Sequence, residues 1–213
     1  ENLNECGNSF GTMKKILPFF SYAFHPIFIP ILGTLSYIIF SERLYTVEQY
    51  YLVLFQVIII TFFLPLTFFY LLRTFGKVDS IMMSEVKQRK IPLIMQMVLT
   101  AVLLQKSITI DRFPELYFFF LGGLISTLIV FLLIYIHFKA SIHMVAISAL
   151  NFFVIGLSIH YQINIIYTIA SLVLLTGIIA SSRLYMRAHT QEELTVGYLC
   201  GVVPQLCLWY FWL

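Results

Sequence analysis

Long apolar runs separated by short polar stretches fill most of this chain of 213 residues. A helix needs about 20 apolar residues to cross a membrane. A weaker run, 91–110, contains Gln96, Gln105 and Lys106, so it is either a short span buried among other helices, which we favour, or a re-entrant segment. The pattern predicts an all-α fold, a polytopic transmembrane helical bundle with six to seven spans. The six stronger runs are 16–40, 50–75, 116–138, 142–160, 164–182 and 191–213.

Prolines interrupt the first two apolar runs. Pro18, Pro26 and Pro30 lie in the first run and Pro65 lies in the second. Membrane helices tolerate proline where neighbouring helices satisfy the freed carbonyls, so these positions predict kinks. His25 precedes one of the prolines, and an ionisable group inside a membrane usually finds a partner within the bundle. We therefore interpret His25 as a buried, satisfied histidine and leave it out of the candidate site.

Small residues recur in two of the apolar runs. Gly197 and Gly201 are four residues apart in the last run. Such a small-xxx-small pattern lets two helix backbones approach closely. Gly122 and Gly123 are interpreted in the same way. We expect all four glycines to serve packing within the monomer.

The N-terminal residues differ from the rest of the chain. Residues 1–12 are polar and have no apolar period, whereas apolar sequence begins soon after Met13. We expect 1–12 to be a disordered tail or a remnant of an expression vector, and 13–213 to form a single transmembrane domain. The run 16–40 exceeds the 7–15 apolar residues, roughly, of a signal peptide and has no small-residue cleavage site, so we interpret it as the first transmembrane helix.

Composition supports a membrane location and narrows the partners. The chain is 60% hydrophobic and 11% charged, and its mean hydropathy is +0.92, values expected of an integral membrane protein. The net charge of +3 comes from basic residues in short loops, which argues against nucleic acid and favours anionic lipid headgroups as partners. Cys6, Cys200 and Cys207 lack metal-ligand spacing.

Charged residues concentrate in the stretch 181–193, between the segments 164–180 and 194–213, which carry no charge. In a helix, His189 and Glu193 lie four residues apart on one face, so the carboxylate can hold an imidazole nitrogen. That contact fixes the tautomer of the ring and raises its basicity. Arg183 and Arg187 lie close by in the sequence, and arginine matches phosphate oxygens with two parallel hydrogen bonds. An oriented imidazole among arginines suits nucleophilic attack on phosphorus.

The same residues resemble the third signature of the phosphatidic acid phosphatase type 2 superfamily, which comprises membrane-integral lipid phosphatases. The match is Ser182, Arg183, five intervening residues, His189 and an acid four residues further on, Glu193. The family usually has aspartate there, so this side chain is longer by one methylene. The resemblance implies that His189 is the nucleophile, Glu193 its orienting acid, and Arg183 and Ser182 phosphate ligands. The alternative is a solvated basic turn at a membrane edge.

Residues 139–143 resemble the second signature of that family, Pro-Ser-Gly-His, through Ser141 and His143 alone. The resemblance implies that Ser141 binds a phosphate oxygen and that His143 protonates the leaving alcohol. Alanine and isoleucine replace the signature's proline and glycine, so the loop geometry differs. The alternative is a helix-capping serine followed by an interfacial histidine.

The first signature, a lysine, six residues and then Arg-Pro, is altered most. Arg89 would keep the phosphate role, but Met82 stands at the position of the lysine and the proline follows only at Pro92. Lys87, Lys90 or Lys139 would supply the missing charge, as point charges without the geometry of a guanidinium. The alternative is a solvated basic loop.

With seven spans, the loops after the second, fourth and sixth helices lie on one side of the membrane. These loops, 73–90, 137–143 and 181–193, contain the three resembling clusters. The expected function is hydrolysis of a phosphate or diphosphate monoester on a membrane lipid through a phosphohistidine, with no cofactor and no metal. The alternative is a non-catalytic relative that binds or transports an anionic lipid. The sequence leaves the lipid and the oligomeric state open.

Charge distribution bears on orientation within the expected location, a bacterial inner membrane. Basic loops favour the cytoplasmic side, which would place the site there, whereas many relatives of the resembled family work on the periplasmic side. The site side carries Lys14, Lys15, Arg73, Lys77, Lys87, Arg89, Lys90, Lys139, Arg183 and Arg187, and the other side carries Arg43, Lys106 and Arg112.

Overall fold

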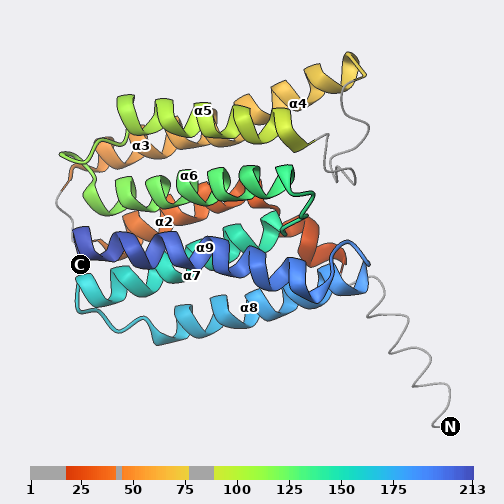
Figure 1. The fold of residues 1–213 in the computed structure, drawn as a ribbon. Helices are drawn as coiled ribbons and strands as arrows, with labels where there is room; N and C mark the ends of the chain where they lie inside the picture. Colours follow the sequence, from red (N-terminus) through yellow and green to blue (C-terminus); the bar gives the residue numbers. More distant parts are fainter. Residues whose placement is uncertain (1–17, 42–44, 77–88) are drawn as a thin grey trace, which may run out of the picture.

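A computed structural model describes residues 18–41, 45–76 and 89–213, and within these ranges the chain is helical without a β-strand. The segment 1–12, expected to be a tail, lies outside the described residues. The helices run side by side along one direction (Figure 1). They are η1 (Pro26–Phe28), α2 (Ile29–Phe40), α3 (Val47–Ile58), η2 (Ile59–Phe63), α4 (Leu64–Thr74), α5 (Lys90–Lys106), α6 (Pro114–Tyr135), α7 (Ile142–His160), α8 (Ile166–Tyr185) and α9 (Gln191–Trp212).

Five helical segments are long and apolar enough to cross a membrane, which identifies an integral membrane protein by length and composition. They are the continuous segment Val47–Thr74, which joins α3, η2 and α4, together with α6, α7, α8 and α9. The apolar segment Pro26–Phe40 is shorter, and α5 has 17 residues. The all-helical fold class is therefore confirmed.

The two proline-containing runs are interrupted as the sequence predicted, each in a different way. Residues 18–23 are helical, 24–25 break the helix, and the chain resumes as η1 and α2. In the second run Pro65 has no N–H to donate to the carbonyl of Thr61. The backbone there forms the π-helical segment η2, and the Thr61 hydroxyl donates to the carbonyl of Val57 at 2.8 Å.

Three interhelical turns use a residue with left-handed backbone. His137 (φ 59°), Gln162 (φ 54°) and Arg187 (φ 51°) follow α6, α7 and α8. After each, an N–H donates back to a carbonyl five residues earlier; after α8 the N–H of Ala188 donates to Arg183. This capping pattern ends a helix abruptly and reverses the chain within a few residues. His189 therefore follows α8 directly, at the edge of the bundle.

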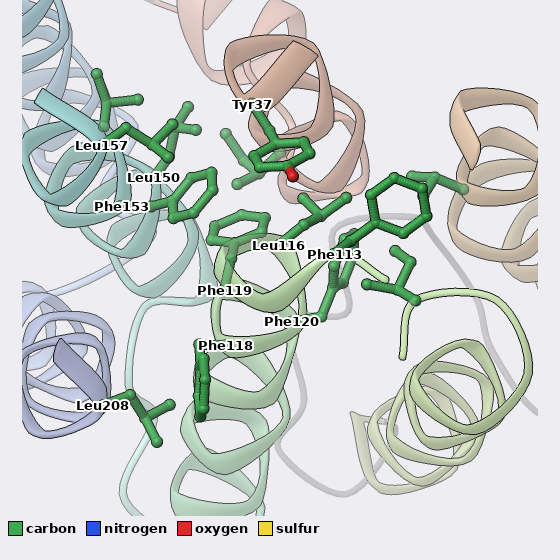
Figure 2. Close-up of a cluster of buried hydrophobic side chains, with 14 of the residues drawn as sticks. Tyr37, Phe113, Leu116, Phe118, Phe119, Phe120, Leu150, Phe153, Leu157 and Leu208 are labelled. Atoms are coloured by element: carbon green, nitrogen blue, oxygen red, sulfur yellow. The ribbon is translucent and has the colours of Figure 1, made fainter. Parts of the chain in front are cut away.

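The core forms where α6, α7 and α9 meet α2. Phe119 of α6 is directed toward Phe153 of α7, with ring centroids 4.5 Å apart, whereas Phe118 is directed toward Leu208 of α9 (Figure 2). Helices α7 and α9 approach closely because a Cβ on Gly197 would lie 2.7 Å from the carbonyl oxygen of Ser141. The packing role predicted for Gly197 is confirmed.

Candidate functional site

One end of the bundle gathers the turns that carry the predicted site. The α6–α7 and α8–α9 turns and the start of α5 lie at the same end, opposite the C-terminus (Figure 1). A cavity of about 560 Å³ opens among these elements, and His25, Arg89, His143, Arg183 and His189 contribute to its wall. Three predicted clusters, far apart in the sequence, therefore meet at one cavity.

The imidazole of His189 is held by the first turn of α9. Its Nδ1 lies 2.8 Å from Oε2 of Glu193, and the N–H of Thr190 donates to the same oxygen at 3.3 Å. The Thr190 hydroxyl in turn accepts from the N–H of Glu193, which completes a capping box. A carboxylate accepts, so Nδ1 carries the proton and Nε2 carries the lone pair. The predicted pairing of His189 with Glu193 is confirmed.

The surroundings of His189 keep it neutral. Burial lowers its pKa to about 4; the hydrogen bond to Glu193 opposes this shift, while the positive charges of Arg183 and Arg89 reinforce it. Only 7% of the residue is exposed. At neutral pH the ring is therefore a neutral imidazole with its proton on Nδ1 only, which is the nucleophilic form.

Two arginines bring buried positive charge to the cavity. Arg183 is 3% exposed and Arg89 is 8% exposed. A terminal nitrogen of Arg183 donates to the hydroxyl of Ser21 at 2.9 Å. Burial, followed by the charge of Arg183, lowers the pKa of Arg89. None of the described residues that line the cavity is an aspartate or glutamate, so an anion would relieve this repulsion.

A second pair of rings lies beside Arg183. Nε2 of His143 lies 3.1 Å from the carbonyl oxygen of Ser21, so it carries a proton and Nδ1 carries the lone pair. The ring of His25 is nearly perpendicular to that of His143, with centroids 5.4 Å apart. His25, which was left out of the candidate site on the sequence alone, lines the cavity. Its position inside an apolar run was the available signal, because intramembrane ionisable residues are usually functional.

Sequence reasoning missed Ser21 altogether. Its carbonyl contacts His143 and its hydroxyl contacts Arg183, so it links α7 to α8 at the cavity. A serine in an apolar run gives no local signal of such a role. Ser21 lies in the helical residues 18–23, and its contacts to His143 and Arg183 come from helices far along the chain.

The structure does not bring the two predicted phosphate-binding serines to the cavity wall. Ser141 is fully buried where α7 meets α9, and its N–H donates to the backbone carbonyl of Glu193 at 3.1 Å. The hydroxyl of Ser182 is buried against Sδ of Met186 at 3.9 Å. Both residues lie in or beside the turns that carry the site, and neither is among the residues that line the cavity.

Of Lys139 and Lys87, which were predicted to bind phosphate, only Lys139 lies within the described residues. Nζ of Lys139 donates to the carbonyl of Ala188 at 3.2 Å, directly before His189. Burial, followed by the charge of Arg89, lowers the pKa of Lys139, which lies beside the cavity without lining it. Lys87 lies outside the described residues. Among the described ranges, no group of three or more His, Cys, Asp or Glu residues is arranged to hold a metal ion.

No protein family, curated protein or solved structure matches this chain. The cavity and the residues around it are therefore the basis for assigning a function.

Proposed function

We propose that this protein hydrolyses a phosphate or diphosphate monoester on a membrane lipid, without a metal, through a phosphohistidine at His189. One observation carries the proposal: a neutral, oriented imidazole shares a cavity with two buried arginines and no described carboxylate. We further propose that the chain is a divergent member of the phosphatidic acid phosphatase type 2 superfamily, because the residues that resemble its third signature adopt the expected contact.

The first chemical step forms a bond between Nε2 of His189 and phosphorus. The phosphorus–oxygen bond to the lipid breaks, and its electron pair leaves with the lipid oxygen. Arg89 and Arg183 bind the equatorial oxygens, where charge accumulates in the transition state. Because these guanidiniums are already buried in place, they need little reorganisation during the reaction. Glu193 stabilises the positive charge that develops on the attacking ring.

His143 transfers the proton that the leaving lipid oxygen requires. The substrate brings the proton for the leaving oxygen, because it binds with one protonated phosphate oxygen. Since Nε2–H of His143 is held by the carbonyl of Ser21, Nδ1 accepts that proton from the phosphate and donates it to the leaving oxygen. In the second step water attacks the phosphohistidine, and Nδ1 of His143 takes the proton from that water. Nδ1 passes this proton to the departing inorganic phosphate, and both histidines return to their starting states. Lys139, Ser141 and Ser182 hold the turns in place, and Lys139 adds charge.

The topology is also part of the proposal. We propose that α2 and α5 cross the membrane with the five long segments, which gives seven spans in a bacterial inner membrane. Basic loops favour a site facing the cytoplasm, and the family resemblance favours the periplasm. The C-terminus lies opposite the site (Figure 1). A reporter fused after Leu213 therefore reads the side away from the site, and its signal assigns the orientation.

Phosphate release from a panel of lipid phosphates tests the activity. Purified protein in detergent should release inorganic phosphate from at least one of phosphatidate, phosphatidylglycerol phosphate and a prenyl diphosphate, with the same rate in excess chelator. Quenching in alkaline denaturant during turnover of a substrate radiolabelled in its phosphate should trap acid-labile, base-stable label on the protein, as phosphohistidine behaves. Release without any trapped label, even at early times, would count against the covalent mechanism.

One observation favours the alternative, a non-catalytic relative that binds or transports an anionic lipid. The Nε2 proton of His143 is engaged with Ser21, and Ser141 and Ser182 do not line the cavity. If the proton donor is not available, the cavity binds an anion without cleaving it. Binding of lipid phosphates without phosphate release would select this function.

A further inference from the structure

The cavity continues well below its charged rim, where Arg89, Arg183 and His189 lie, into a deeper part that we call the chamber. Along α5 its wall extends from Arg89 to Thr100, a depth of about 16 Å at the helical rise of ~1.5 Å per residue. Its deepest wall on α6 is formed by Phe119 and Phe120, at the end away from the site. The rim and this chamber form one continuous space, so a molecule whose phosphate contacts the arginines can extend its remainder into the chamber.

The chamber wall behaves as an apolar surface. Its side chains are mainly aliphatic and aromatic, and its hydroxyl groups are committed to their own helices. Thr61, Thr100, Ser126 and Thr127 each donate to a backbone carbonyl four residues earlier, at 2.8 Å. A hydroxyl whose proton is committed in this way offers no donor to a ligand. The chamber therefore favours a hydrocarbon over a polar group.

Two adjacent glycines show that the space is kept open at one position. A Cβ on Gly122 would lie within 3 Å of the side chain of Gln205, so close packing requires that glycine. A Cβ on Gly123 would meet nothing within 4 Å, and Gly123 lines the cavity. Packing was therefore the wrong interpretation of Gly123. It lies one helical turn above Phe119 and Phe120, where any larger side chain would fill the chamber.

The volume limits what the chamber holds. A methylene group and a water molecule occupy similar volumes, roughly 30 Å³, so the cavity of about 560 Å³ accommodates on the order of twenty non-hydrogen atoms. A phosphate and one hydrocarbon chain fill that space. We propose that the chamber binds a single unbranched hydrocarbon chain of the phosphorylated substrate, and that Gly123 and Phe120 set the longest chain it accepts. The phosphate end of this proposal rests on the proposed function.

A chain-length series tests the proposal. Alkyl phosphates from hexyl to octadecyl, kept below the concentrations at which they form micelles, are assayed for phosphate release. Each added methylene that enters the chamber should raise kcat/KM up to about fourfold, until the chain reaches the end. In Gly123→Leu this limit should move to shorter chains, by the length of about one helical turn, ~5 Å. In Phe120→Ala it should move to longer chains.

Two matched variants control for general effects. Gly177→Leu adds the same side chain on α8, where a Cβ also meets nothing within 4 Å but the residue does not line the cavity. Phe118→Ala removes the same ring from α6, where it stacks on Phe211 outside the cavity. Both controls should keep the wild-type limit. An unchanged limit in both Gly123→Leu and Phe120→Ala, with hydrolysis intact, overturns the chain-binding proposal.

A binding measurement separates the two proposals. The matching alkyl phosphonates, which cannot be hydrolysed at the carbon–phosphorus bond, are titrated by calorimetry against the same variants. In one outcome, affinity rises with chain length up to a limit that becomes shorter in Gly123→Leu, while no substrate releases phosphate. That result would support the chamber assignment and reject the phosphatase activity. Affinity that is independent of chain length rejects the chamber assignment, even if the phosphatase activity is present.

Discussion

The two ends of the bundle each contain a pair of histidine and glutamate in which one partner is buried, and the pairs differ in their neighbours. At the site end His189 contacts Glu193 at 2.8 Å, beside two arginines and a cavity. At the other end His160 contacts Glu115 at 3.3 Å, and Tyr161 donates to the same carboxylate oxygen at 2.8 Å. Neither His160 nor Glu115 lines the cavity.

The surroundings therefore decide what an otherwise similar pair can do. The His160–Glu115 pair joins the end of α7 to the start of α6, and the carboxylate is satisfied by a phenol and an imidazole. The His189–Glu193 pair is local to one helix turn, and its histidine lines a cavity that Arg89 and Arg183 also line. A histidine–carboxylate pair is thus weak evidence of catalysis until its access and the charges beside it are known.

The largest expected difference between the ends is in catalysis. Asparagine in place of His189 should lower phosphate release by about 10⁴-fold or more, because the proposed nucleophile is lost. His160→Asn should keep the activity near wild type. Both rates are measured on the lipid phosphate that the wild-type protein hydrolyses fastest, and size-exclusion profiles confirm that the variants are folded. Equal loss in both variants would contradict the division of roles between the ends.

Replacing each of the two glutamates by glutamine should give a smaller difference between the two ends. Glu193→Gln should lower kcat by about 10³-fold, less than loss of the nucleophile, because glutamine cannot stabilise the charge that develops on the ring. Glu115→Gln should leave kcat unchanged, since an amide oxygen still accepts from Tyr161, and should cost about 1 kcal/mol of stability. Thermal unfolding in detergent provides the second measurement, and a larger kcat effect from Glu115→Gln would be contrary to this account.

The protonation of His189 gives the smallest but most specific contrast. Its pKa of about 4 means that the ring stays neutral as pH falls from 7 to 5 and becomes protonated only around pH 4. Modification by diethyl pyrocarbonate, which requires the neutral ring, should inactivate the protein at a constant rate over that range, after correction for reagent hydrolysis. A fall in that rate centred near the ordinary value of about 6.5 would show that burial does not control this ring.

The same pKa makes a statement about stability. Because the folded-state pKa is below that of the unfolded chain, the unfolded state takes up a proton first as pH falls. The contribution of His189 to stability is therefore fully present above about 6.5 and is lost as pH falls toward 4. Replacement of His189 by asparagine should flatten this part of the stability profile.

Local sequence determined a large part of this protein. The apolar runs specify helices because a backbone in lipid must satisfy its own hydrogen bonds. A spacing of four positions places His189 and Glu193 on one helix face, and Thr190 caps that helix three residues before Glu193. These features depend on contacts within a single turn, so their prediction needed no knowledge of the fold.

Tertiary packing decided which side chains face the cavity. Ser21 and Arg183 are 162 positions apart in the chain, yet they are hydrogen-bonded. Ser141 matches a catalytic signature, yet it packs between helices, whereas Gly123 resembles a packing residue and lines a chamber. Whether a side chain points into a cavity or against a neighbouring helix depends on how each helix is rotated and how closely its neighbours approach. Those packing contacts involve residues from the whole fold. The sequence therefore determined the helices and the imidazole–carboxylate pair, and the assembled bundle determined the cavity.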